Sequence, residues 1–239
     1  MSFQVILEQL TVGFGKTLLI FFLTLIFSMP LGLVVCLGRM SRWSPFDFLV
    51  GKREEPTGIK KVLTSFRPVQ LIFKLYISVL RGTPLMLQLL AVCYGPYYLF
   101  HVKLPSSWTF MAVILGFVIN YSAYFAEIYR GGIESMSVGQ YEAAEVLGYT
   151  KMQTFMKIIL PQVIKRILPS VTNEIITLVK DTSLAFVLAY AEMFTIAKQI
   201  AAAKTTFMPL FVAGVFYFIF NAVVAYTMEF CEKKLSYYR

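Results

Sequence analysis

The stretch LLIFFLTLIFSMPLGLVVCL, residues 18–37, decides the fold class, because it runs for twenty residues without a charged side chain. A helix rises about 1.5 Å per residue, so about twenty apolar residues cross a bilayer core of about 30 Å. The run therefore predicts a membrane-spanning helix. With its flanking residues, we place this first span at about residues 14–38.

The composition of the whole chain also favours an integral membrane protein. Of the 239 residues, 58% are hydrophobic and only 15% are charged, whereas about a quarter of the residues of soluble domains are charged. So few charges could hardly cover the water-facing surface of a soluble protein of this length. The length suits one domain, and we treat residues 1–239 as a single transmembrane domain.

Further apolar stretches complete the set of spans. Residues 82–100, 108–126 and 205–228 carry no charge, and the second of the five spans begins earlier, near Leu71. The candidate at 171–191 is apolar except for Asn173–Glu174 at its start and Lys180–Asp181 at its centre. We predict an all-α integral membrane protein with about five transmembrane helices, at about 14–38, 71–99, 108–128, 171–191 and 205–229.

The distribution of Lys and Arg predicts the orientation. Sixteen of the 22 lie in segments that these spans put on one side: the linker 39–74, the segment 130–166 and the tail after residue 229. Because positive residues favour the cytoplasm, we expect the N-terminus outside and the C-terminus in the cytoplasm. The net charge of +9 follows from this topology, so we expect lipid but no nucleic acid as a partner.

The most specific motif, GQYEAAEVLGYTKMQTFMKIILPQ at residues 139–162, lies on the predicted cytoplasmic side. Residues 142–147 favour a short helix, because Ala, Glu and Leu are good helix formers, and Gly148 suits a left-handed helix stop. Residues 149–160 predict a second helix, which we expect Pro161 to interrupt. Two short helices joined at a glycine bend form a compact knob that another protein surface can grip.

This motif resembles the EAA loop of binding-protein-dependent ABC importers, whose pattern is Glu-Ala-Ala, three residues, Gly, nine residues, then Ile-x-Leu-Pro. Residues 142–144, Gly148 and residues 158–161 match it in full. The RGTPL stretch at 81–85, AY at 123–124 through Glu127 to RGG at 130–132, LPQ at 160–162 and KDTSL at 180–184 resemble the polar amino-acid branch of the family. Residues of about 44–62 look like a cytoplasmic insertion. An ordinary amphipathic hairpin is the alternative interpretation of the motif.

The resemblance implies a type I ABC importer permease with MetI-like architecture, a multi-pass protein of the bacterial plasma (inner) membrane. It implies a second permease subunit, identical or related, a cytoplasmic ABC ATPase and an extracytoplasmic amino-acid-binding protein as partners. The sequence has no Gly-x-x-x-x-Gly-Lys-Ser/Thr phosphate loop, so we expect no catalysis by this chain alone and no cofactor of its own. ATP and Mg would bind to the ATPase. The coupling residues implied by the motif are Gly139, Glu142, Ala143, Ala144, Gly148, Leu160 and Pro161.

Polar side chains within the spans are the candidates for the substrate path, because they are costly in a bilayer and usually face an interior or an aqueous cavity. The planar guanidinium of Arg81 suits a carboxylate, and Pro84 loosens the helix beside it. Lys180 meets either a substrate carboxylate or a structural partner, for instance Glu174 or Glu127. The candidate residues are Arg81, Thr83, Asn120, Tyr121, Glu127, Lys180, Asp181 and Thr182.

Structural roles compete with transport for several of these residues. Amide and hydroxyl side chains at membrane depth, such as Asn120, more often join helices. Glu127 and Arg130 are three residues apart on a helix and can pair locally. The sequence does not distinguish glutamine, arginine, cystine or another polar amino acid as the substrate.

Two other classes of function are weighed against a permease. A secondary carrier is usually longer and built from inverted repeats, and no internal repeat is visible. A membrane-embedded enzyme needs a metal site or a nucleophile beside a histidine. The chain has one histidine, and its three cysteines show no metal-ligand spacing, so we expect no metal site.

Overall fold

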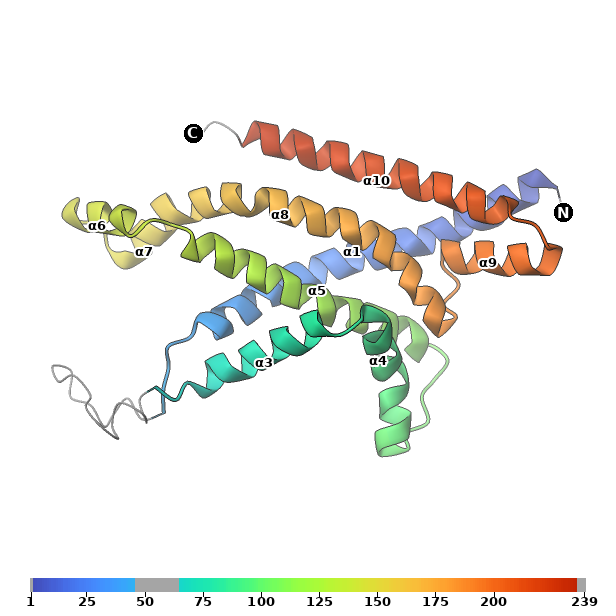
Figure 1. The fold of residues 1–239 in the computed structure, drawn as a ribbon, viewed down its shortest axis with the longest axis horizontal. Helices are drawn as coiled ribbons and strands as arrows, with labels where there is room; N and C mark the ends of the chain where they lie inside the picture. Colours follow the sequence, from blue (N-terminus) through green and yellow to red (C-terminus); the bar gives the residue numbers. More distant parts are fainter. Residues whose placement is uncertain (1, 46–64, 236–239) are drawn as a thin grey trace.

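The computed structural model describes residues 2–45 and 65–235, and every element in these ranges is a helix (Figure 1). The expected insertion at 44–62 lies almost wholly outside the described residues. Three helices are long and apolar enough to cross a membrane, and two bent helix pairs raise the number to as many as five. The predicted all-helical, multi-span fold is therefore confirmed.

Three spans are single long helices. They are α1 (Phe3–Met40), α5 (Trp108–Glu134) and α10 (Met208–Lys234). Helix α1 extends beyond both expected bounds, α5 and α10 extend beyond the expected C-terminal bound, and α10 begins three residues later than expected. Polar residues at the ends continue these helices because intrahelical hydrogen bonds satisfy the backbone beyond the bilayer core. With 38 residues, α1 is much longer than the roughly 20 residues that a crossing needs.

The second expected span, 71–99, is not one continuous helix. It consists of α3 (Pro68–Gly82) and α4 (Leu85–Phe100), which are bent by 112° relative to each other. Pro84 lacks a backbone donor, and it holds the preceding Thr83 in an extended conformation, with φ −123° and ψ 148°. In Figure 1, α4 leaves the bundle at a steep angle from the end of α3.

The segment after α5 reverses direction and runs back along the bundle. It contains α6 (Val138–Val146), α7 (Lys151–Thr154), a π-helical turn (Phe155–Ile159), α8 (Leu160–Asp181), a 3₁₀ helix (Thr182–Leu188) and α9 (Met193–Lys204). The fourth span therefore begins well before residue 171, its α-helical part ends at Asp181, and α9 continues it after a bend of 55°.

Pro161 does not interrupt the second helix of the motif, so that expectation was wrong. It lies in the first turn of α8, directly after the π-helical turn, in which the Leu160 amide donates to the Phe155 carbonyl. A π turn shifts the hydrogen-bond register by one residue. The chain therefore passes the proline, which has no amide to donate, as one helical rod from Lys151 onward.

The helix α5 forms the centre of the bundle. In its most apolar window 67% of the residues are buried, compared with 17% for α10, which lies at the periphery. Phe117, Tyr121 and Phe125 of α5 pack into one core with residues of α1 and α8. At Gly32 of α1 the helices are so close that a Cβ would lie 2.8 Å from the Phe125 Cβ. The helices α6 and α7 lie at the end of the bundle opposite to the start of α1, and the C-terminal end of α10 lies beside α8, where the Thr172 hydroxyl donates to Glu232 (Figure 1).

Candidate functional site

The glycine of the cytoplasmic motif has the geometry that its position predicts. Gly148 has φ +77°, in the left-handed region that a residue with a Cβ rarely adopts. The Gly148 amide donates to the Glu145 carbonyl at 2.9 Å, and the Tyr149 amide donates to the Ala144 carbonyl at 3.0 Å. These two bonds are those of a Schellman motif, so α6 ends in a fixed turn and the chain reverses into α7.

Side-chain hydrogen bonds hold the hairpin of α6 and α7 against α8. Gln140 and Gln162 exchange two amide hydrogen bonds, of 2.8 and 2.6 Å, between α6 and α8. Thr150 and Gln153 form a capping box at the start of α7. Ala144 is only 1% exposed, so its small side chain lies against the interior of the hairpin. The hairpin is therefore one packed unit with α8.

The outer surface of the hairpin carries several exposed apolar side chains. Val146 is 87% exposed, Leu147 73% and Met152 70%. Gly139, Glu142, Ala143 and Gly148 are also exposed, while Leu160 and Pro161 are half-buried at the start of α8. Exposed apolar surface rimmed by polar groups is typical of a protein docking site.

The break between α3 and α4 exposes a second group of candidate residues. Arg81, Gly82, Thr83 and Pro84 are all exposed on this chain. Behind them, the Gln88 amide donates to the Leu80 carbonyl at 2.9 Å and to the Thr83 carbonyl at 3.0 Å. The Asn120 amide of α5 donates to the Gln88 carbonyl oxygen at 2.9 Å. Asn120 is 4% exposed, so it supports the break from inside the bundle.

Arg81 is held loosely and keeps spare hydrogen-bond donors. Its guanidinium lies 5.2 Å from the centre of the Tyr124 ring and 3.9 Å from Glu127. Glu127 is bound more closely by Arg130, whose Nε and terminal nitrogen donate to its two oxygens at 3.1 and 2.7 Å, as the local pairing predicted. Arg130 also pairs with Glu134. The side chain of Arg81 remains 44% exposed and can receive a carboxylate.

The end of α8 brings the remaining candidates together. The Tyr121 hydroxyl donates to the Asp181 carboxylate at 2.8 Å, and Tyr121 is 2% exposed. The Thr182 hydroxyl is fully buried and donates to the Val179 carbonyl. Lys180 is exposed, and among the described residues it forms no salt bridge. The structural ion pair with Glu174 or Glu127 is therefore not present.

Two polar residues, Gln88 and Glu192, were not predicted from the sequence, and Glu174 was named there only as an alternative partner of Lys180. Gln88 braces the break, and Glu174 lies close enough to Arg81 and Asp181 to interact with both electrostatically. Glu192 is fully buried and joins α1, α9 and α10 through Thr17, Thr195 and Tyr217. A single polar residue within an apolar run was the only signal, and it does not name a partner.

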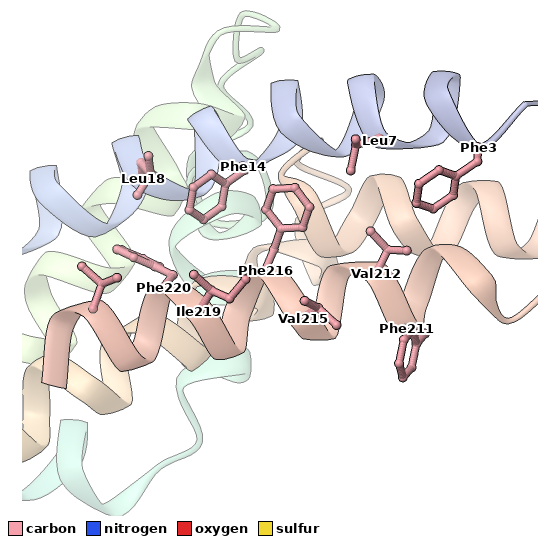
Figure 2. Close-up of a pocket in the computed structure, with 11 residues that line it drawn as sticks. Phe3, Leu7, Phe14, Leu18, Phe211, Val212, Val215, Phe216, Ile219 and Phe220 are labelled. Atoms are coloured by element: carbon pink, nitrogen blue, oxygen red, sulfur yellow. The ribbon is translucent and has the colours of Figure 1, made fainter. Parts of the chain in front are cut away.

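A large hollow of about 690 Å³ lies outside this polar region (Figure 2). It runs between α1 and α10 and is lined by Phe3, Leu7, Phe14, Leu18, Phe211, Val212, Val215, Phe216, Ile219, Phe220 and Val223. None of these side chains carries a hydrogen-bonding group, so the hollow suits lipid chains and not the passage of a polar solute.

Comparison with known proteins points to one family. A family model described as "Binding-protein-dependent transport system inner membrane component" matches residues 59–237. The arginine transport system permease protein ArtQ of Bacillus subtilis is 34% identical over 73% of this chain and 78% of its own length. The L-cystine transport system permease protein TcyB of the same organism is 31% identical over 95% of this chain and 86% of its own.

Two solved structures share the fold. The crystal structure of an amino acid ABC transporter with histidines aligns with a TM-score of 0.79 and 29% identity, over 98% of this chain and 99% of that one. A structure of the MetNI methionine ABC transporter in an inward-facing conformation aligns with a TM-score of 0.73 over 99% and 100% of the two chains. At 15% identity, the second comparison concerns the fold alone.

Proposed function

This chain belongs to the binding-protein-dependent transport system inner membrane component family, as an amino-acid ABC importer permease of the bacterial inner membrane, and from this premise we propose that it carries a polar amino acid. The permease forms the translocation path together with a second permease subunit, identical or related. An extracytoplasmic binding protein delivers the substrate, and a cytoplasmic ATPase, which binds ATP and Mg, drives the cycle.

The observation that carries this proposal is the cytoplasmic hairpin, with its fixed turn at Gly148 and its exposed apolar surface. The hairpin is the coupling element that seats in the ATPase. Glu142 and Ala143 lie on its exposed surface, Gly139 and Gly148 let the partner approach closely, and Ala144 packs inside it. Leu160 and Pro161 join the hairpin to α8.

Helix α8 is the mechanical link between the hairpin and the polar residues at its other end, Tyr121, Lys180 and Asp181. The helical rod from Lys151 to Asp181 is continuous through the π turn. Gln140 and Gln162 bind the hairpin to the near end of this rod, and the hydrogen bond from Tyr121 to Asp181 binds its far end to α5. When the ATPase closes, the hairpin moves α8, and the movement reaches the path at Lys180 and Asp181.

The substrate surface consists of the exposed polar groups of this cluster. Arg81 has spare guanidinium donors and Lys180 lacks an ion pair, so both can attract the carboxylate of an amino acid. Glu127 and Glu174 supply negative charge for the ammonium group of the same zwitterion. The exposed Thr83, at the break, adds a hydroxyl. Asn120, Tyr121 and Thr182 are buried and hydrogen-bonded within the chain, so we assign them the support of this surface.

The coupling role is tested at Gly148. The full chain is co-expressed with its ATPase subunit, and the purified complex in lipid is assayed for ATP hydrolysis, for wild type, Gly148→Val and Gly148→Asn. Valine is strained at positive φ, at a cost of about 1–2 kcal/mol, whereas asparagine tolerates the left-handed region. No atom lies within 4 Å of an added Cβ within the chain, so the backbone conformation is the property that changes.

We expect Gly148→Val to lose association with the ATPase or its hydrolysis, and Gly148→Asn to retain more of both. A valine variant that equals wild type in both measurements would contradict the coupling role. A wild-type chain that purifies without any ATPase and transports in response to an ion gradient would instead favour a secondary carrier.

A further inference from the structure

A group of cations gathers where the end of α1 meets the start of α3, next to the Glu127–Arg130 pair. Arg39 and Arg42 lie at the end of α1, and Arg67 and Lys74 lie at the start of α3. Together they line two adjoining hollows of about 320 and 290 Å³, which share Arg39 and Arg67. We define these four cations and the hollows between them as the basic groove.

The cations of the basic groove have no acidic partners within the described residues. None of the four forms a salt bridge with another residue in the ranges 2–45 and 65–235. The one carboxylate in the lining, Glu134, is already paired with Arg130. The Nε of Arg67 is buried and has no hydrogen-bond partner, which is costly unless a ligand accepts its hydrogen. Within the part of the chain that the structure describes, the groove therefore has no carboxylate that neutralises these four cations.

The surroundings indicate what kind of anion fits. No side chain caps the N-terminus of α3, which begins at Pro68 beside Arg67, so its free amides add a partial positive charge. Convergent guanidinium groups at such a helix end match the oxygens of a phosphate. The shared chemistry is thus a phosphate group, from a phospholipid or from free phosphate in the cytoplasm.

Apolar residues next to the groove favour the phospholipid. Leu71 is 57% exposed, Trp43 56% and Phe66 48%, and Leu71 and Phe66 line the same hollow as the cations. A tryptophan is typical of the headgroup level of a membrane. Basic pockets between transmembrane helices on the cytoplasmic side bind anionic headgroups. We propose that the basic groove binds the phosphate of an anionic phospholipid in the cytoplasmic leaflet and thereby ties the end of α1 to the start of α3.

The test measures lipid binding to the purified full-length chain in detergent. Phosphatidylglycerol and phosphatidylcholine are added in turn, and bound lipid is counted by native mass spectrometry as a function of concentration. We expect wild type to prefer phosphatidylglycerol, and Arg39→Gln with Arg67→Gln to bind it roughly 30-fold more weakly, as the loss of two basic contacts at a membrane surface implies.

A matched control removes two charges on the same side of the membrane at another place. Lys233→Gln with Lys234→Gln, at the end of α10, should keep the affinity of wild type for phosphatidylglycerol. Since Arg67 is partly buried, Arg42→Gln with Lys74→Gln serves as a second variant. Both of its side chains are exposed, so the chain should fold normally, and we expect it to bind phosphatidylglycerol more weakly too.

Three outcomes would overturn the proposal. Equal loss of binding in the groove and control variants would show a general effect of charge. Equal binding of phosphatidylcholine and phosphatidylglycerol would exclude recognition of an anionic headgroup. If inorganic phosphate displaces bound phosphatidylglycerol and raises the Tm of wild type as much as the lipid does, the groove is a site for soluble phosphate. A preference for phosphatidylglycerol that is lost only in the groove variants supports the lipid site.

Discussion

At the scale of single residues, the polar side chains of the bundle form two groups: those that hydrogen-bond within the chain, and those that keep donors free. Asn120 and Tyr121 are buried and bonded to Gln88 and Asp181. Arg81 is exposed, and its one carboxylate contact is 3.9 Å long. An unused donor is available to a substrate, whereas a used one must first be released at the cost of its hydrogen bond. Replacement of Arg81 should therefore weaken substrate binding more than it lowers the stability of the fold.

For Arg81→Ala we expect the KM for amino-acid-stimulated ATP hydrolysis by the reconstituted complex to rise at least about tenfold. The reason is that a hydrogen bond to a charged group contributes about 1.5–3 kcal/mol. The Tm should fall little, since a partly exposed, long ion pair contributes no more than about 0.5 kcal/mol. Arg81→Lys keeps the charge without the planar fork and should fall between the two. An unchanged KM in Arg81→Ala would remove Arg81 from the substrate surface.

At the scale of the elements, the break between α3 and α4 depends on the side chain of Gln88, which is not part of the backbone hydrogen bonding of either helix. Pro84 causes the break, but it leaves carbonyl groups at the end of α3 without intrahelical donors. The Gln88 amide reaches back to the carbonyls of Leu80 and Thr83, and Asn120 fixes Gln88 in place from α5. The bend of 112° is thus held by α5 as well as by the proline.

Replacement of Gln88 by leucine, of similar size, should destabilise the chain by about 1–3 kcal/mol, because it leaves carbonyl acceptors and the Asn120 amide unsatisfied. The measurement is the Tm of the purified protein in one detergent. Gln9→Leu is the control, since Gln9 is exposed on α1 and its side chain forms no hydrogen bond. Equal Tm values for the two variants would mean that Gln88 does not hold the break.

At the scale of the whole molecule, one buried carboxylate joins three helices at the outer end of the bundle. Glu192 accepts hydrogen bonds from the backbone amides of Phe194 and Thr195 at 2.7 and 2.6 Å, which caps α9. Tyr217 of α10 donates to it at 3.1 Å and Thr17 of α1 at 3.4 Å. Because only 17% of the most apolar window of α10 is buried, we expect this junction to contribute much of its attachment to α1 and α9.

We expect Glu192→Ala to lower stability by about 2–4 kcal/mol, since it removes a helix cap and strands several buried donors. Glu192→Gln keeps the shape and one acceptor oxygen, so it should cost less than alanine. The readout is Tm together with the rate of proteolysis in the loop after α9. Glu8→Ala, an exposed carboxylate on α1, is the control, and a shift for Glu192→Ala no larger than that of the control would contradict the junction.

Much of this architecture could be predicted from the sequence, because its signals are local. The length of an apolar run determines whether a segment crosses the bilayer, and the placement of Lys and Arg determines its orientation. The glycine stop at Gly148 was predictable for the same reason, since it depends on six consecutive residues and their backbone hydrogen bonds. Pro84 predicted a loosened helix in the second span, but it predicted neither the complete break nor its angle.

Only the tertiary structure decided which distant parts of the chain pair with each other. Tyr121 and Asp181 are 60 positions apart, and Thr17 and Glu192 are 175 apart. No local rule links them, because a contact between helices depends on how each is rotated and tilted against the others. For the same reason, the sequence left open whether Lys180 has a structural partner, and among the described residues it forms no salt bridge. The sequence thus determined which residues are polar within the membrane, and the packing of the helices determined which of them remain free to bind a substrate.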